Sequence, residues 1–241
     1  MVDWMVEVFS IFTSMDATYF LAVYLMDMYT WKSIKDLKNE DVHLIGVTCM
    51  YMASKFQEVE YIRLSKFVKQ VSHNSFTAEE IKKKESEIIE VITPECLIIT
   101  SIYDFVVTYF FDFYENNKEL LQTENDKKVF QYLKETSIYL SKICLHYDAF
   151  YQELSSLNAV SCIVCGIKLI QKYANDIFSN NAKSSFNEWI QFLWNRGGFE
   201  KKKIETISSK IYSAYSHYQK SKSISRNLNK FKPLKYIKNQ K

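Results

Sequence analysis

Residues 44–55 read Leu-Ile-Gly-Val-Thr-Cys-Met-Tyr-Met-Ala-Ser-Lys, and residues 157–168 repeat the pattern as Leu-Asn-Ala-Val-Ser-Cys-Ile-Val-Cys-Gly-Ile-Lys. Small residues hold corresponding places in both stretches, and large apolar residues fill the positions between them. A helix that is apolar on every side has to lie inside its domain, and small side chains let neighbouring helices approach it closely. The pattern therefore predicts two buried central helices and suggests two copies of one helical fold. Buried helices also share composition, so a chance likeness stays open.

The composition favours helices over sheets. The chain has 241 residues with only 4 Gly and 2 Pro, whereas sheet proteins need many turn residues. This length allows one large domain or two ordinary ones, with a core that needs no disulfide bonds. The 5 cysteines are an odd number, and most of them lie in apolar runs. That usage indicates buried thiols in a reducing compartment, and we predict an all-α fold.

Apolar periodicity divides the chain into about five helices in each half. Two sequences of the capping-box type, Thr77-x-x-Glu80 and Ser185-x-x-Glu188, predict helix starts, and Pro94 ends a helix. We predict an amino-terminal domain at residues 1–94, a carboxy-terminal domain at 95–220 and a basic tail at 221–241. The expected helices cover residues 2–13, 17–30, 41–58, 62–71 and 77 to Pro94, then 98–116, 124–144, 149–174, 185–195 and 200–219.

The charge is unevenly distributed along the chain. The net charge is +3, but residues 221–241 carry seven basic side chains and no acidic one. The remaining 24 basic and 28 acidic side chains give residues 1–220 a net charge of about −4. An acidic body does not favour nucleic-acid binding, and no apolar segment is long enough to predict a membrane span. The tail is either a solvated segment or an arm for nuclear import or phosphate contact.

A search for catalytic motifs finds none. The four glycines form no phosphate-binding loop, and the histidines show no metal-ligand spacing. Cys162-x-x-Cys165 has the spacing of a metal or redox site, but it lies in an apolar helical run with no second pair nearby. We therefore expect buried packing thiols, no metal, no cofactor and no enzymatic activity. The protein is expected to act through its surface.

Several stretches together resemble the cyclin box over residues 1–94. They are Met1-Val-Asp-Trp-Met-Val-Glu-Val8, Thr18-Tyr-Phe-Leu-Ala-Val-Tyr-Leu-Met-Asp27, the stretch 44–59 ending in Ala-Ser-Lys-Phe-Gln-Glu-Val, and Phe76-Thr-Ala-Glu-Glu-Ile with the acidic-apolar run after it. The second half is less similar. Its Tyr147-Asp148 and Leu154-Ser-Ser-Leu look like the carboxy-terminal cyclin fold. The resemblance implies two tandem five-helix cyclin folds.

The resemblance to cell-cycle cyclins implies a regulatory subunit that binds and activates a cyclin-dependent protein kinase, in the nucleus, the cytoplasm or both. In that family a lysine and a glutamate bind the kinase, and the corresponding residues here are Lys55 and Glu85. One fixed cation and one fixed anion, with apolar neighbours, suit a desolvated interface centre. The apolar neighbours implied by the resemblance are Met52, Phe56, Val59 and Ile89.

The family's docking patch for substrate or inhibitor motifs falls on Trp4, Glu7 and His43. His43 stands where the family usually has glutamine. The sequence begins inside the cyclin box, so the residues that normally precede the tryptophan have no counterpart in it. A docking groove that lacks those residues is expected to bind docking motifs weakly.

Two alternatives to a kinase activator stay open. One is a non-activating cyclin-fold adaptor that resembles a transcription-initiation factor, and the other is a pseudo-cyclin scaffold. An adaptor of the first kind binds DNA through basic surfaces, whereas the body of this chain is acidic. The presence of both Lys55 and Glu85 also favours the kinase regulator.

Overall fold

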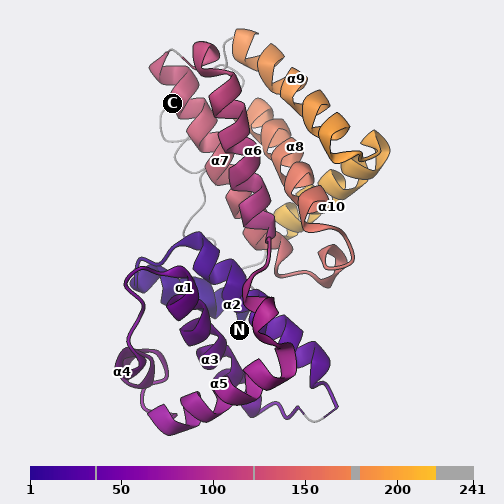
Figure 1. Ribbon diagram of the computed structural model, residues 1–241. Coiled ribbons are helices and arrows are strands. Elements are labelled where there is room, and N and C mark those ends of the chain that lie inside the picture. Colours follow the sequence, from indigo (N-terminus) through magenta and orange to yellow (C-terminus); the bar gives the residue numbers. More distant parts are fainter. Residues whose placement is uncertain (36, 122, 175–179, 221–241) are drawn as a thin grey trace. The chain divides into compact units, whose positions relative to one another are not determined.

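A computed structural model shows that the chain is all-α, as predicted (Figure 1). It describes residues 1–35, 37–121, 123–174 and 180–220, and within these ranges there are ten α-helices and no strand. The predicted basic tail, residues 221–241, lies outside the described residues. The chain divides into two compact units, Met1–Ser101 and Ile102–Lys241.

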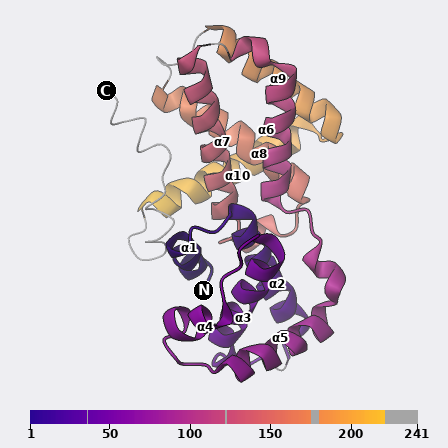
Figure 2. The same ribbon diagram turned by 60° about the vertical axis from the view of Figure 1, so that its left-hand side comes forward.

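The first unit is built around one buried helix (Figures 1 and 2). Residues 45–54 of that helix, α3, are all buried, and α3 packs against α2, α5 and the π-helical turn that follows α4. This confirms the prediction of a buried central helix at 44–55. The elements of the unit are α1 (Val2–Ile11), α2 (Asp16–Lys32), α3 (Asp41–Gln57), α4 (Leu64–Lys66), the π-helical turn Phe67–Val71 and α5 (Ala78–Ile92).

Small residues on α3 lie where other parts of the unit approach it. A Cβ added at Gly46 would lie 2.6 Å from Met1 Sδ, and Ala53 has no exposed surface. A larger side chain at either place would have to displace its neighbours, because cores are packed without voids of that size. The small residues of the repeat therefore mark close packing.

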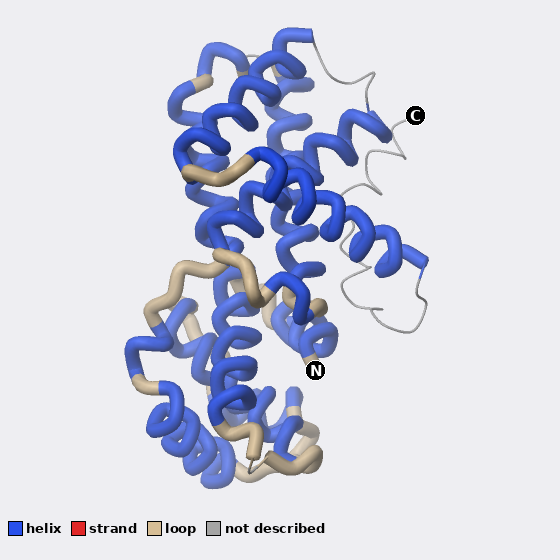
Figure 3. Tube along the Cα trace, turned by 90° about the vertical axis from the view of Figure 1, so that its right-hand side faces the viewer, coloured by secondary structure: helices blue, strands red, loops and turns tan. Residues whose placement is uncertain are grey.

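The predicted capping box starts α5. The Thr77 hydroxyl accepts the Glu80 N–H at 3.2 Å, and the Glu80 carboxylate accepts the Thr77 N–H at 2.7 Å. The bonds from the backbone and the hydroxyl of Thr77 hold the pKa of Glu80 below its usual value. Figure 3 shows the helices joined by short loops, which fits the few turn residues in the composition.

The second unit has its own central helix, α8, which contacts the four other α-helices of the unit. A Cβ at Gly166 would lie 3.1 Å from Ser137 Oγ and 3.3 Å from Leu133 Cδ1, so α7 crosses α8 closely at this glycine. The repeat at 157–168 thus has the same packing role as the first copy. The helices are α6 (Ile102–Asn116), α7 (Glu124–Cys144), α8 (Ser155–Ala174), α9 (Asn180–Gly197) and α10 (Lys201–Lys220).

Three helix starts differ from the predictions by four residues or more. The helix expected at 98 begins at Ile102, after the 3-10 turn Pro94–Leu97 and a short irregular stretch. The helix expected at 149 begins at Ser155, because Asp148–Phe150 forms a 3-10 turn whose last carbonyl accepts the Asn158 side-chain amide at 2.8 Å. The capping box expected at Ser185 is wrong, since α9 already begins at Asn180. No proline or glycine stands between residues 180 and 185 to stop the helix from extending upstream.

Candidate partner-binding surface

Lys55 and Glu85 form an ion pair between α3 and α5, although they lie 30 residues apart in sequence. The side chain of Lys55 is 35% exposed and that of Glu85 is 16% exposed, so the pair lies at the surface of the first unit. The Lys55 ammonium also lies 4.5 Å from the centre of the Tyr51 ring. A cation held by a carboxylate and an aromatic face has little freedom to reorient.

Tyr51 is a residue of this site that sequence reasoning missed. It is 8% exposed and stands one helical turn before Lys55, so both side chains lie on one face of α3. Burial raises the pKa of the Tyr51 phenol, Lys55 opposes that rise, and Glu85 and Tyr61 add to it. The i,i+4 spacing of an aromatic residue and a lysine was the available signal.

The predicted apolar neighbours separate into two groups. Phe56 is 48% exposed and Val59 is 99% exposed, whereas Met52 is 3% exposed. Ile89 on α5 is half-buried. Met52 therefore lies in the core under the surface, where any effect on binding passes through packing. Tyr61, 50% exposed, joins Phe56 and Val59 as a further exposed apolar residue after α3.

The segment that carries Val59 is anchored at both ends. The buried Ser54 hydroxyl accepts the Ile62 N–H at 2.8 Å, which ties the end of the segment back to α3. Glu58 Oε1 accepts the Met15 N–H at 2.8 Å and also the Thr18 hydroxyl. Glu58 thereby caps α2, whose own N-cap residue, Met15, makes no side-chain capping bond. These bonds hold the exposed apolar residues in place before any partner binds.

The predicted docking residues lie near one another in the same unit. The rings of Trp4 and His43 meet edge to face with centroids 5.1 Å apart, and His43 meets Phe76 in the same way at 5.2 Å. Glu7 lies one turn further along α1 than Trp4. Phe76 was not among the predicted site residues. It precedes the capping box of α5, at the position where an apolar residue commonly packs against the start of a helix.

The described residues offer little for metal or redox chemistry. They contain no group of three His, Cys, Asp or Glu side chains arranged to hold a metal ion. Cys162 and Cys165 are buried on α8, with Cys162 Sγ 3.7 Å from Cys144 Sγ. Burial raises the pKa of the Cys165 thiol to about 12, which leaves it protonated and unreactive at neutral pH. In the described part of the chain, each helix is too short or too polar to cross a membrane.

Comparison with known proteins shows which family the chain resembles. Residues 1–95 match the model of the cyclin N-terminal domain. A G2/mitotic-specific cyclin-B from Hydra vulgaris is 24% identical over 211 residues, which cover 88% of this chain and 50% of that protein. Residues 1–95 therefore correspond to a cyclin N-terminal domain, and the chain as a whole is similar to cyclins. Cyclin-A2-4 from Arabidopsis thaliana is 31% identical to this chain over 90 residues, which cover 37% of this chain and 19% of that protein.

The likeness in fold extends beyond the matched domain. The X-ray structure of a viral cyclin from herpesvirus saimiri superposes with a TM-score of 0.62 at 18% identity, covering 90% of this chain and 85% of that one. The fold prediction is confirmed by this likeness. The chain spans about half the length of the Hydra cyclin-B. The matched domain and the relatives are all cyclins by name, which agrees with the prediction that the chain is not an enzyme.

Proposed function

We propose that this protein is a cyclin that binds and activates a cyclin-dependent protein kinase, as a regulatory subunit in cell-cycle control in the nucleus, the cytoplasm or both. The observation that carries the proposal is the Lys55–Glu85 ion pair on the surface of the first unit, with exposed Phe56 near the end of α3 and exposed Val59 just after it. Charges at the centre of an interface determine orientation, and apolar neighbours supply buried area.

The ion pair keeps hydrogen-bonding capacity for a partner. Among the described residues, Glu85 accepts a hydrogen bond only from Lys55, through one of its two carboxylate oxygens. An ammonium group has three donors, so Lys55 has donors left as well. A partner that covers the pair can bond to both charges while they still compensate each other. This reduces the cost of removing them from water.

The surface suits a protein kinase as its partner. A protein kinase is active only when its own Lys–Glu ion pair is formed and its activation segment is in place. A rigid surface that packs on the kinase helix carrying that Glu would stabilise the active arrangement. The anchored segment after α3 provides such rigidity, because Ser54 and Glu58 fix both of its ends.

The Trp4–His43–Phe76 cluster is the second part of the proposal. We assign it to docking motifs of substrates or inhibitors, because it is an aromatic, half-buried surface in the first unit with the acidic Glu7 on the same helix as Trp4. Aromatic residues are enriched at protein–protein interfaces.

A binding and activity assay tests the function. The full chain is mixed with purified cyclin-dependent kinases, and we measure both complex formation and phosphorylation of a kinase substrate. Wild-type chain should bind and activate at least one kinase, and Lys55→Ala and Glu85→Ala should lose both effects. The matched control is Lys118→Ala, which removes the lysine of an exposed ion pair with Glu115 on the second unit and should change neither. Binding without activation would favour the scaffold, and no binding to any kinase would refute the proposal.

A further inference from the structure

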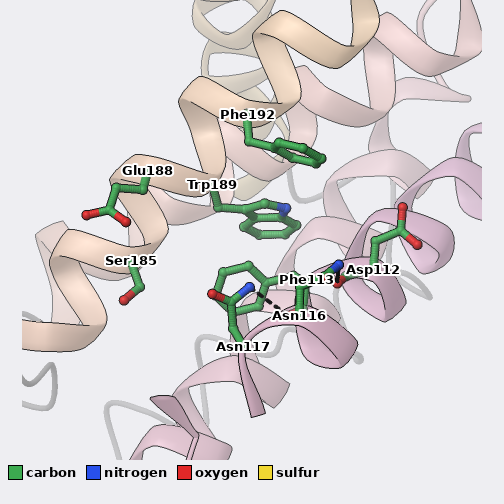
Figure 4. A pocket seen from close by; sticks show the side chains of 8 residues that line it. All are labelled: Asp112, Phe113, Asn116, Asn117, Ser185, Glu188, Trp189 and Phe192. Atoms are coloured by element: carbon green, nitrogen blue, oxygen red, sulfur yellow. Dashed lines mark hydrogen bonds between the residues drawn. The ribbon is translucent and has the colours of Figure 1, made fainter. Parts of the chain in front are cut away.

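The second unit contains a surface pocket between the end of α6 and the middle of α9 (Figure 4). Its volume is about 220 Å³. Sites for drug-sized ligands commonly measure about 300–1,000 Å³, so this pocket suits a single side chain better than a whole small molecule. Its lining residues are Asp112, Phe113, Asn116, Asn117, Ser185, Glu188, Trp189 and Phe192.

The pocket has a rigid aromatic wall. Trp189 is 4% exposed and packs on Phe113, with ring centroids 4.7 Å apart, and Phe113 also stacks on Phe186 at 5.4 Å. Figure 4 shows the Phe192 ring above the Trp189 indole, and Phe192 is 49% exposed. Aromatic faces held by a packed core offer a preformed surface to a flat or cationic group.

The polar groups of the pocket are mainly hydrogen-bond acceptors. The Asn116 side-chain N–H donates to the Asp112 carbonyl at 2.7 Å, and the Asn117 side-chain N–H donates to the Phe113 carbonyl at 2.9 Å. The side-chain oxygen of each asparagine can therefore accept a hydrogen bond from a ligand. Figure 4 shows Glu188 with Asn117 on one side of the pocket and Asp112 with Asn116 on the other. The pocket also lies at the carboxyl end of α6, where the helix dipole favours a cation.

A second and independent observation concerns the Trp189 indole. Its N–H has no hydrogen-bond acceptor among the described residues, although the side chain is almost fully buried. Figure 4 shows the nitrogen edge of the ring turned toward the Asp112 and Asn116 side of the pocket. A buried N–H without an acceptor costs folding free energy, and a carbonyl group of a bound ligand would remove that cost by accepting its hydrogen bond.

We propose that this pocket binds an arginine residue of a partner peptide. The guanidinium group would lie against the aromatic wall and donate to Glu188 and the asparagine oxygens, and a peptide carbonyl would accept from the Trp189 indole. Arginine fits better than lysine, because its planar group stacks on rings and directs several donors outward at once. None of the described lining residues is Lys or Arg, which would repel it. The inference does not depend on kinase binding.

Nuclear magnetic resonance of the full chain tests the proposal directly. The protein is labelled with ¹⁵N, and its tryptophan indole signals are followed while N-acetyl-L-arginine amide is added. The Trp189 signal is identified by its loss in Trp189→Phe. We expect it to move with saturation while the Trp4 and Trp31 signals stay in place. N-acetyl-L-citrulline amide, which has the same shape without the charge, should bind much more weakly.

Charge variants show whether the pocket causes the effect. Glu188→Gln should weaken arginine binding by about fivefold, the scale of one exposed charge pair. Glu205→Gln makes the same change on α10, outside the pocket, and should leave the affinity unaltered. A Trp189 signal that does not move, equal binding of the citrulline probe, or equal loss in both variants would each overturn the proposal.

Discussion

Glu58 is the residue whose removal should most clearly reveal how the candidate surface is held. It lies at the end of α3, yet its carboxylate accepts the Met15 N–H and the Thr18 hydroxyl at the start of α2. The change Glu58→Ala removes both bonds at once. We expect it to destabilise the first unit and to loosen the segment that carries Val59.

The magnitude follows from the two bonds. Loss of a helix N-cap costs about 0.5–2 kcal/mol. Thr18 has no exposed surface, and a buried hydroxyl that loses its partner costs about 1–3 kcal/mol. Such neighbouring effects are not additive, so we expect a loss of about 2–3 kcal/mol in the free energy of unfolding. Glu58→Gln keeps an oxygen that can accept from Met15 and should cost clearly less than Glu58→Ala.

Urea denaturation provides the assay. Trp4 and Trp31 lie in the first unit and report its unfolding by fluorescence, with Trp189 and Trp194 replaced by Phe in every sample compared. Glu60→Ala is the matched control, because Glu60 lies in the same segment and is exposed. If Glu58→Ala unfolds at the same urea concentration as Glu60→Ala, the carboxylate does not hold the two helices together and the reasoning is refuted.

Three further predictions address other parts of the first unit. Lys55→Ala or Glu85→Ala should weaken kinase binding by about 2–5 kcal/mol by calorimetry, with an unchanged circular dichroism spectrum, because each leaves a charge uncompensated in the interface; wild-type affinity in both would contradict the assignment. Ala53→Leu should cost about 1–3 kcal/mol in urea denaturation, since a fully buried position has no room for the larger side chain; an unchanged midpoint would mean that α3 is not central. The pKa of Glu80 is below its ordinary value of 4.5 in the fold, so its contribution to stability is present above pH 4.5 and is lost as the pH falls through the lowered value. The difference in unfolding free energy between wild type and Glu80→Gln should therefore shrink between pH 7 and pH 3, and a constant difference would show that the ionised carboxylate is not the stabilising form.

Much of the candidate surface could be predicted from sequence only because it resembles a known family. Lys55 by itself is a lysine at the end of an apolar helix, where such side chains commonly reach solvent. Glu85 stands after three lysines on an amphipathic helix, where a solvated face is the ordinary interpretation. Neither pattern indicates a pair, because their contact depends on how α5 crosses α3.

Local physics determined the parts that the sequence predicted by itself. The apolar repeat with small residues specified two buried central helices, since no other placement removes every face of such a helix from water. The Thr77-x-x-Glu80 box specified the start of α5, since its bonds lie within one turn. Only the tertiary structure decided which distant side chains meet: Glu58 with the start of α2, Lys55 with Glu85, and the residues of α6 and α9 around one pocket. Those contacts depend on how helices pack across long sequence separations, which periodicity along a single helix does not encode.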